Sequence, residues 1–137
     1  MKYNYIIGID PDLHKSGLAI YDTNKKSLVT CEAAEMWYLF ECLYVYNDLS
    51  VLIRLEYPSN TNTWHRGGKG AALNVGKNQA VAIIIKEFLD SIGANYELIA
   101  PAGYSKLFDN EETFKRTTGW ILRTNKDARA AAAMCWR

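Results

Sequence analysis

The sequence predicts an α/β domain built on a mixed five-stranded sheet. Two short apolar runs, residues 5–10 and 51–56, are rich in isoleucine and leucine and each ends on an acid, which is typical of buried strands. A segment with apolar residues at helical spacing lies between them, so a helical connection allows the two strands to run parallel. The polar turn after the first run predicts an antiparallel return. We expect the remaining strands at 18–21, 27–31 and 96–100.

The segments between the strands have the patterns of helices and loops. Residues 32–46 predict a helix that packs its apolar stripe on the sheet. Residues 59–70 are rich in glycine and asparagine and lack periodicity, which predicts a loop. Residues 71–92 predict the longest helix, closed by Gly93. In the last third we expect a short helix at 102–108, a turn at 117–120 and an alanine-rich helix at 125–136.

Length and composition restrict the class of protein. The chain has 137 residues, enough for one domain with a hydrophobic core, and 49% of its residues are apolar. The net charge of +1 provides no overall field for nucleic acid or membranes, so any such binding must rest on local patches. The three cysteines show no C-x-x-C spacing. Neither a signal peptide nor a membrane span is indicated, and we expect a cytoplasmic protein.

Asp10 and Glu56 are the first candidate functional residues, because each closes a predicted strand. If the two strands are parallel, both carboxylates lie at the same edge of the sheet, where ligands gather in open α/β folds. A carboxylate in such a place is costly unless it is paired or bound to a metal, and two convergent oxygens suit Mg²⁺. Single strand-end acids are commonly structural. Asp127 is a third candidate, although an acid in the first turn of a helix also favours the helix dipole.

The predicted loop at 59–70 contains an indole and cations without any acid. Its glycines give mobility, its cations suit phosphate, and an indole can stack on a base. The alternative is a solvated loop with the indole on the surface. The residues concerned are Trp64, His65, Arg66 and Lys69. The last third is locally basic as well, with each cation expected to be solvated: Lys106, Lys115, Arg116, Arg123, Lys126 and Arg129.

Short motifs in a fixed order extend over nearly the whole chain. They are Gly8-Ile9-Asp10-Pro11 with Ser16-Gly17, Leu55-Glu56 followed by Pro58, Leu73-Asn74-Val75-Gly76 with Gln79-Ala80-Val81-Ala82, Ala100-Pro101 with Lys106, Thr118-Gly119-Trp120, and Thr124-Asn125-Lys126-Asp127-Ala128-Arg129. Together they resemble the RuvC-like Holliday junction resolvases of the ribonuclease H-like superfamily, with the phage-encoded branch most similar. No single motif is decisive, but their order and spacing are specific.

This resemblance implies a ribonuclease H-like fold with helices on both faces of the sheet. It also implies a homodimeric endonuclease that cuts a four-way or branched DNA junction symmetrically with two Mg²⁺ or Mn²⁺ ions per active site. Asp10 would bridge the metals, Glu56 would bind one of them, and Asp127 would complete the set. The helix at 71–92 would form the dimer interface, and Trp64 would probe the junction. Candidates for DNA contact are Trp64, His65, Arg66, Lys69, Lys77, Lys106, Lys115 and Arg116.

The sequence departs from the family pattern at two positions. Asp12 stands where the family has a second glycine in its first motif, which we interpret as a tolerable change in a turn. The final helix of the family has two metal-binding positions three residues apart, and here they align with Asp127 and Ala130. Either the register is shifted and Asp127 is the main ligand, or Ala130 marks the natural or engineered loss of a catalytic Asp. The run Ala130-Ala131-Ala132-Ala133 favours the second explanation.

Other functions remain open at this stage. A YqgF-like nuclease acting on RNA or another branched substrate shares the first strand motif. A junction-binding protein that does not cut would fit Ala130, and a structural domain with incidental acids is a further alternative. An actin-like ATPase needs two such domains and does not fit a chain of this length.

Overall fold

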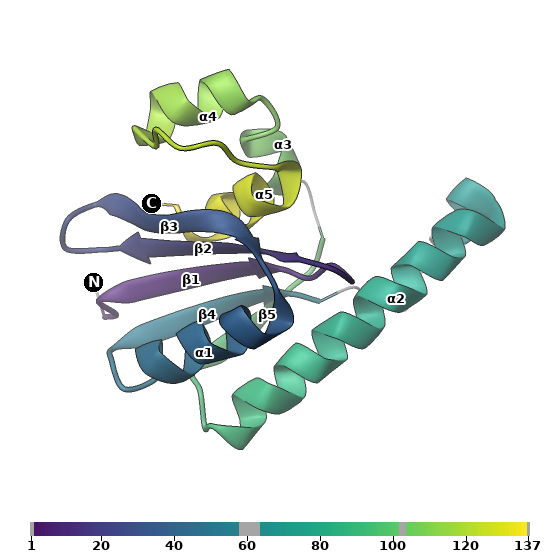
Figure 1. Cartoon of the computed structure of the whole chain (residues 1–137), viewed down its shortest axis with the longest axis horizontal. Coiled ribbons are helices and arrows are strands. Elements are labelled where there is room, and N and C mark those ends of the chain that lie inside the picture. Colours follow the sequence, from purple (N-terminus) through teal and green to yellow (C-terminus); the bar gives the residue numbers. More distant parts are fainter. Residues whose placement is uncertain (1, 58–63, 102–103, 137) are drawn as a thin grey trace.

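The computed structural model describes residues 2–57, 64–101 and 104–136, and the side chains of 64–75 and 104–105 lie outside this description. It contains one five-stranded sheet with helices on both faces (Figure 1), as predicted. The strand order is β3-β2-β1-β4-β5. The bounds of the strands are Tyr5–Asp10 for β1, Ser16–Asp22 for β2, Ser27–Ala34 for β3, Val51–Glu56 for β4 and Tyr96–Ile99 for β5.

The sheet is mixed, which confirms the expected topology. β1 pairs antiparallel with β2, and β2 with β3, so the first three strands form a meander. β1 runs parallel to β4, and β4 runs parallel to β5. The parallel pair at the centre of the sheet therefore brings the carboxyl ends of β1 and β4 to one edge.

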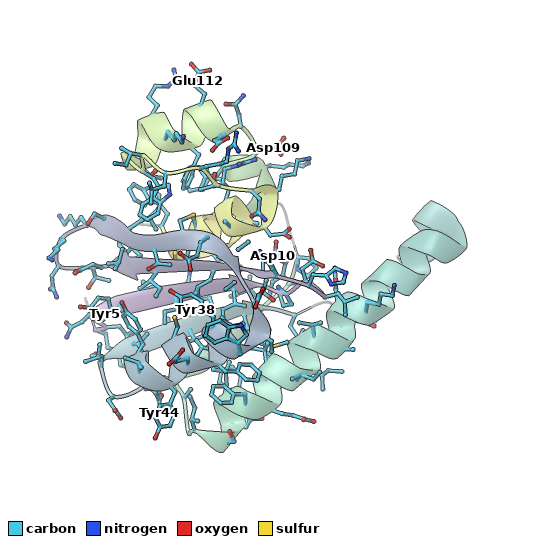
Figure 2. All side chains as sticks on the ribbon, in the orientation of Figure 1. Tyr5, Asp10, Tyr38, Tyr44, Asp109 and Glu112 are labelled. Carbon is cyan, nitrogen blue, oxygen red and sulfur yellow. The ribbon has the colours of Figure 1, made fainter. Side chains whose placement is uncertain are left out.

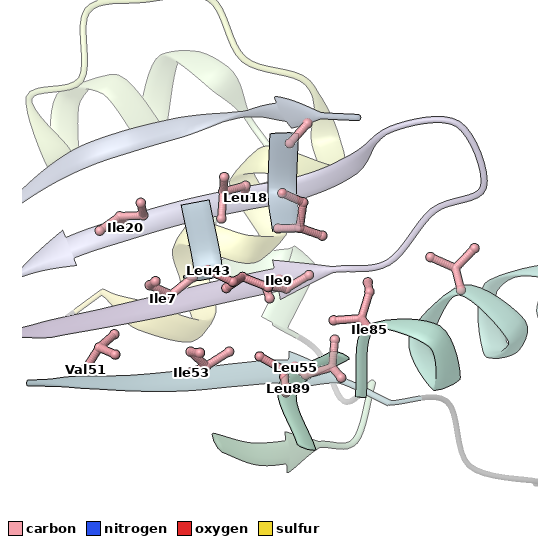
Figure 3. Packing of buried hydrophobic residues seen from close by; sticks show 13 residues of the cluster. Ile7, Ile9, Leu18, Ile20, Leu43, Val51, Ile53, Leu55, Ile85 and Leu89 are labelled. Carbon is pink, nitrogen blue, oxygen red and sulfur yellow. The ribbon is translucent and has the colours of Figure 1, made fainter. Parts of the chain in front are cut away.

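One face of the sheet packs against α1 (Met36–Tyr46) and α2 (Trp64–Ser91). Side chains alternate between the two faces along a strand, and Ile7 and Ile9 of β1 point to this face. They belong to a buried cluster (Figure 3) with residues of β2, β4 and both helices. The cluster contains Leu18, Ile20, Leu39, Leu43, Ile53, Leu55, Val81, Ile85 and Leu89.

The opposite face packs against α5 (Lys126–Cys135), with α3 (Tyr104–Leu107) and α4 (Glu111–Thr118) beside it (Figure 1). Ile6 points to this face, and Gly8 occupies the next position on it. A Cβ at Gly8 would overlap the carbonyl group of Ala131 in α5. Glycine is therefore required at position 8 for the helix to lie against the strand.

The larger differences from the predicted boundaries lie in β3, α2 and α4. Residues 32–34 extend β3 instead of starting a helix, because they pair with residues 16–18 of β2. Residues 64–70 begin α2, so their interpretation as loop was wrong: glycine lowers helix propensity by about 1 kcal/mol but does not forbid a helix. Residues 111–118 form α4, so the turn predicted at 117–120 was wrong for Thr117 and Thr118; Asn110 caps this helix by accepting a hydrogen bond from the Thr113 amide.

Within the described ranges, no helix combines the length and the apolar character that crossing a membrane requires.

Candidate functional site

The candidate site lies at the carboxyl ends of β1 and β4. Asp10 is the last residue of β1, and Glu56 is the last residue of the neighbouring strand β4. Ile9 pairs with Leu55 in the parallel register, so the acids occupy the next positions. Because Ile9 and Leu55 point to the face covered by α1 and α2, the alternation turns Asp10 and Glu56 to the α5 face. Their carboxyl groups form a hydrogen bond. Figure 2 labels Asp10 at this end of the sheet.

α5 brings Asp127 to the same place. Asn125 caps the helix by accepting a hydrogen bond from the Ala128 amide at 2.8 Å, which fixes its first turn. Gly17 lies opposite Asp10 in the β1–β2 pair, and a Cβ on Gly17 would overlap the Asp127 carbonyl. The bare backbone at Gly17 therefore admits the first turn of α5, and the side chains of Asp127 and Asp10 are in hydrogen-bond contact.

Asp12, in the turn between β1 and β2, contributes a fourth carboxyl group, which forms a hydrogen bond with Asp127. The turn is held by the Asp12 amide, which donates to Ser16 Oγ at 3.2 Å, and by Asp12 Oδ1, which accepts from the Leu13 amide at 2.6 Å. Sequence reasoning missed this residue as part of the site. The sequence did contain an indication of its role, because an acid stands two residues after Asp10 at a position where the family pattern has glycine.

Proximity changes the proton affinity of these acids. Burial raises the pKa of Asp10 to about 10, with further increases from the hydrogen bond and charge of Glu56 and from the charges of Asp127 and Asp12. Burial and the hydrogen bond to Asp12 raise the pKa of Asp127 to about 6, although the hydrogen bond from Asp10 opposes this increase. Protonated Asp10 therefore donates toward its acidic neighbours at neutral pH.

The donor set fits a hard divalent cation in its chemistry, because all four groups are carboxyls with oxygen ligands. A cation bound there would replace the shared protons and relieve the charge repulsion that, in addition to burial, raises the pKa values of Asp10 and Asp127. Among the described residues, no three His, Cys, Asp or Glu side chains converge into a preformed metal-binding group. The four acids are instead linked in pairs, from Glu56 through Asp10 and Asp127 to Asp12.

Ala130 lies one helical turn after Asp127 and is buried, with 6% of its surface exposed. Positions three apart share one side of a helix, so Ala130 follows Asp127 on the side that carries the acid. A methyl group stands there, and the second acidic position implied by the family pattern supplies no carboxylate in this chain.

The predicted DNA contacts fall into three groups. Lys77, Lys106 and Arg116 are exposed, whereas Lys115 forms an ion pair with Glu111 at 3.7 Å. The backbone of Trp64, His65, Arg66 and Lys69 belongs to α2, but their side chains lie outside the described residues.

Arg129 was predicted to be a solvated cation, and this was wrong. It is buried, and its guanidinium group donates to the carbonyls of Phe108 at 2.9 Å, Asp109 at 3.2 Å and Thr124 at 3.2 Å. Carbonyl oxygens of two chain segments satisfy its N–H groups, and this allows the charge to be buried. Arg129 therefore ties the segments before α4 and before α5 to the final helix.

The architecture and the acidic edge define an α/β protein with a ribonuclease H-like fold. No family model matches the sequence, and no curated protein matches it. Among solved structures, RuvC of Thermus thermophilus in complex with a Holliday junction substrate has a TM-score of 0.65 and 14% sequence identity, covering 98% of this chain and 91% of that one. A second Thermus thermophilus RuvC structure has a TM-score of 0.53 and 15% identity, covering 94% and 91%. The chain therefore has the RuvC fold, as its motifs predicted.

Proposed function

We propose that this protein is a metal-dependent endonuclease that resolves four-way (Holliday) and other branched DNA junctions. The observation that carries the proposal is the series of contacts from Glu56 through Asp10 to Asp127, residues of two parallel strands and a helix, in a chain with the RuvC fold. One of the similar solved structures is RuvC in complex with a Holliday junction substrate, and this likeness supports branched DNA as the ligand. We place the protein in the cytoplasm of a bacterial or phage-infected cell.

In this proposal Asp10, Glu56 and Asp127 hold Mg²⁺ or Mn²⁺, two ions per site, and Asp12 adds a further carboxylate beside Asp127. The bound metal would supply activation of the attacking water and stabilisation of the leaving 3′-oxygen. The chain's own contribution is positional. Asp10 contacts both Glu56 and Asp127, and the pairing of β1 with β4 fixes the spacing of the first two acids.

DNA would approach the acidic edge from the side of the exposed cations. Lys77, Lys106 and Arg116 are exposed to solvent and suit phosphate, as does Lys115 once its weak surface pair with Glu111 opens. Trp64, His65, Arg66 and Lys69 remain proposed contacts at the start of α2. Each cation would add affinity that falls with rising salt concentration.

We further propose that two copies associate through α2. On its solvent side this helix exposes Ala80, Ile83 and Ile84, which share one face through their spacing of three and four residues. Ile83 and Ile84 are 44% and 47% exposed, so the solvent side of α2 offers adjacent apolar side chains that a second copy could cover. A dimer would present two acidic centres to two strands of one junction.

Ala130 supports a second candidate, a protein that binds junctions but cuts them poorly. Its methyl group occupies the position where the family pattern has a second acid on the last helix. Substitution by aspartate would add a carboxylate on the same side of α5 as Asp127.

The test pairs binding with cleavage. A labelled four-way junction and a linear duplex of matched sequence are incubated with the protein and with its Ala130→Asp variant, with and without Mg²⁺. Asp10→Asn is the catalytic control, since it keeps the size of the side chain and removes the ionisable group.

Each outcome separates the candidates. Preferential binding and Mg²⁺-dependent cutting of the junction by the original chain support the resolvase and make Asp127 sufficient on α5. Cutting by Ala130→Asp alone supports a disabled resolvase. If neither protein distinguishes the junction from the duplex, the junction-binding proposal is wrong, and an RNA substrate is the next candidate.

A further inference from the structure

A cavity of about 350 Å³ lies beside the acidic centre, between the β1–β2 turn and α2. Its lining residues are Asp12, Leu13 and His14 from the turn and Lys77 and Asn78 from α2. Asp12 is shared by the cavity and the acidic centre, because its carboxyl group contacts Asp127. The cavity is therefore continuous with the place where the proposed chemistry occurs.

The face of α2 that lines this cavity changes character along the helix. Val81, Ile85 and Leu89 follow one another at intervals of four residues and are buried against the sheet. Lys77 occupies the preceding position of the same series, and it is exposed and polar. The change coincides with the passage of α2 beyond the carboxyl end of β1 (Figure 1), where the helix faces the turn instead of the strands.

If the contact between α2 and the turn were purely structural, we would expect an apolar residue at position 77, as at positions 81, 85 and 89 of the same helix face. The chain instead places an ammonium group, an amide and an imidazole around an open space, whose lining also includes Leu13 and the Asp12 carboxyl group on the side of the acidic centre. Lys77 forms no ion pair within the described part of the chain. Its charge is therefore available to an anion from outside.

We propose that this cavity binds one backbone phosphate of the cleaved DNA strand, next to the scissile position, with Lys77 and His14 as donors. This inference rests on the proposed function, since it assumes that DNA reaches the acidic centre. The volume is at the lower end of ligand sites, which span roughly 300–1,000 Å³, so it has room for one phosphate group of a single strand and not for a duplex. Asp12 would face the acidic centre while the α2 cation faces the phosphate.

The experiment measures the affinity of the full chain for a labelled four-way junction over a series of salt concentrations, in EDTA so that the DNA stays intact. The variants are Lys77→Ala and His14→Ala. Lys25→Ala is the matched control, because Lys25 is equally exposed but lies in the β2–β3 turn at the opposite end of the sheet. Thermal unfolding of each variant verifies that the fold is intact.

For Lys77→Ala we expect weaker binding and a salt dependence whose slope is lower by about 1, the value for the loss of one phosphate contact. A junction with a single methylphosphonate, moved along the strand, identifies that phosphate. At one position the methylphosphonate should weaken the binding of the original chain. At the same position it should leave the affinity of the Lys77→Ala variant unchanged. His14→Ala is expected to weaken binding at the same phosphate.

Equal slopes for Lys77→Ala and Lys25→Ala would overturn the inference while leaving the junction-binding proposal intact. Failure of the original chain to bind branched DNA would instead overturn the proposed function, and this inference with it.

Discussion

The carbonyl oxygen of Asp127 occupies the space that the Cβ of any side chain on residue 17 would need. Gly17 is also the register partner of Asp10 across the β1–β2 pair. One glycine therefore admits the first turn of α5 at the strand position opposite the central acid. The carboxyl groups of Asp127 and Asp10 meet because a side chain is missing between the two backbones.

Gly17→Ala should lower the free energy of unfolding and move Asp127 away from Asp10. The added methyl group meets backbone atoms, which cannot rotate aside, so we expect a loss of about 3 kcal/mol, the upper end of typical overpacking. Urea unfolding gives the stability, and Mg²⁺ titration monitored by thermal shift gives the effect on the acidic centre.

Gly76→Ala is the control for this change. Gly76 lies in α2, where an added Cβ would meet no atom within 4 Å, and alanine at a helical glycine adds roughly 0.5–1 kcal/mol of stability. Equal behaviour of the two variants would show that close packing at Gly17 does not position α5.

The stability of the protein in EDTA should fall as the pH rises because of Asp10. Its folded pKa of about 10 lies above the ordinary value of 3.8, so the folded protein keeps a proton that the unfolded chain releases between these values. The folded state binds more protons in this window, and the free energy of unfolding decreases with pH. Asp127, with a folded pKa of about 6, adds to the decrease only between about pH 4 and pH 6.

Asp10→Asn should flatten this dependence, and its benefit over the original chain should grow from pH 5 to pH 9. Urea unfolding at several pH values measures it, with the exposed Asp109→Asn as control. Parallel curves for the original chain and Asp10→Asn would contradict the raised pKa.

Asp12→Asn should lower the pKa of Asp127 and weaken divalent metal binding. Asp12 raises the pKa of Asp127 through its charge and hydrogen bond, and the amide removes the charge. Carbon-detected NMR titration of the carboxyl groups gives the pKa of Asp127.

Saturating Mg²⁺ at 100 times its dissociation constant should stabilise the original chain by about 2.7 kcal/mol. Removal of the metal with EDTA should abolish this gain, and Asp12→Asn should show a smaller gain at the same concentration. An unchanged Asp127 pKa would exclude the contact.

Arg129→Met should destabilise the protein through the groups that it leaves unsatisfied. The variant loses hydrogen bonds to the carbonyls of Phe108, Asp109 and Thr124, and the buried Phe108 carbonyl is then left without a donor. We expect a loss of about 3 kcal/mol. Hydrogen exchange should be faster in α4 than in β1, since α4 loses its connection to the final helix. Arg123→Met, at an exposed position, should change neither measurement.

The sheet and two of its acids were predictable because their signals are local. Apolar runs that end on Asp10 and Glu56, with a helix between them, determine a parallel pair and place both carboxylates at one edge. The family pattern indicated Asp127 before its contact with Asp10 was known. In each case a short stretch of sequence contains the feature that matters.

Other features depend on partners that are distant in sequence. Asp12 looks like an ordinary turn residue until α5 places Asp127 beside it. In the sequence Arg129 looks like a surface cation. Its burial is favourable only because the fold brings the carbonyls of Phe108, Asp109 and Thr124 within hydrogen-bond distance of its guanidinium group. The glycines of 64–70 have low helix propensity, but the helix of 71–91 extends through them.

The glycine contacts connect the first strand of the chain with its last helix. Gly8 faces Ala131, and Gly17 faces Asp127, so α5 covers a strip of bare backbone that no other described element fills. A nascent chain that has not yet reached α5 would leave this strip open and would lack its third acid. The acidic centre thus forms only after synthesis has passed residue 127, and a fragment truncated earlier would contain both strand-end acids without the helix that completes the centre.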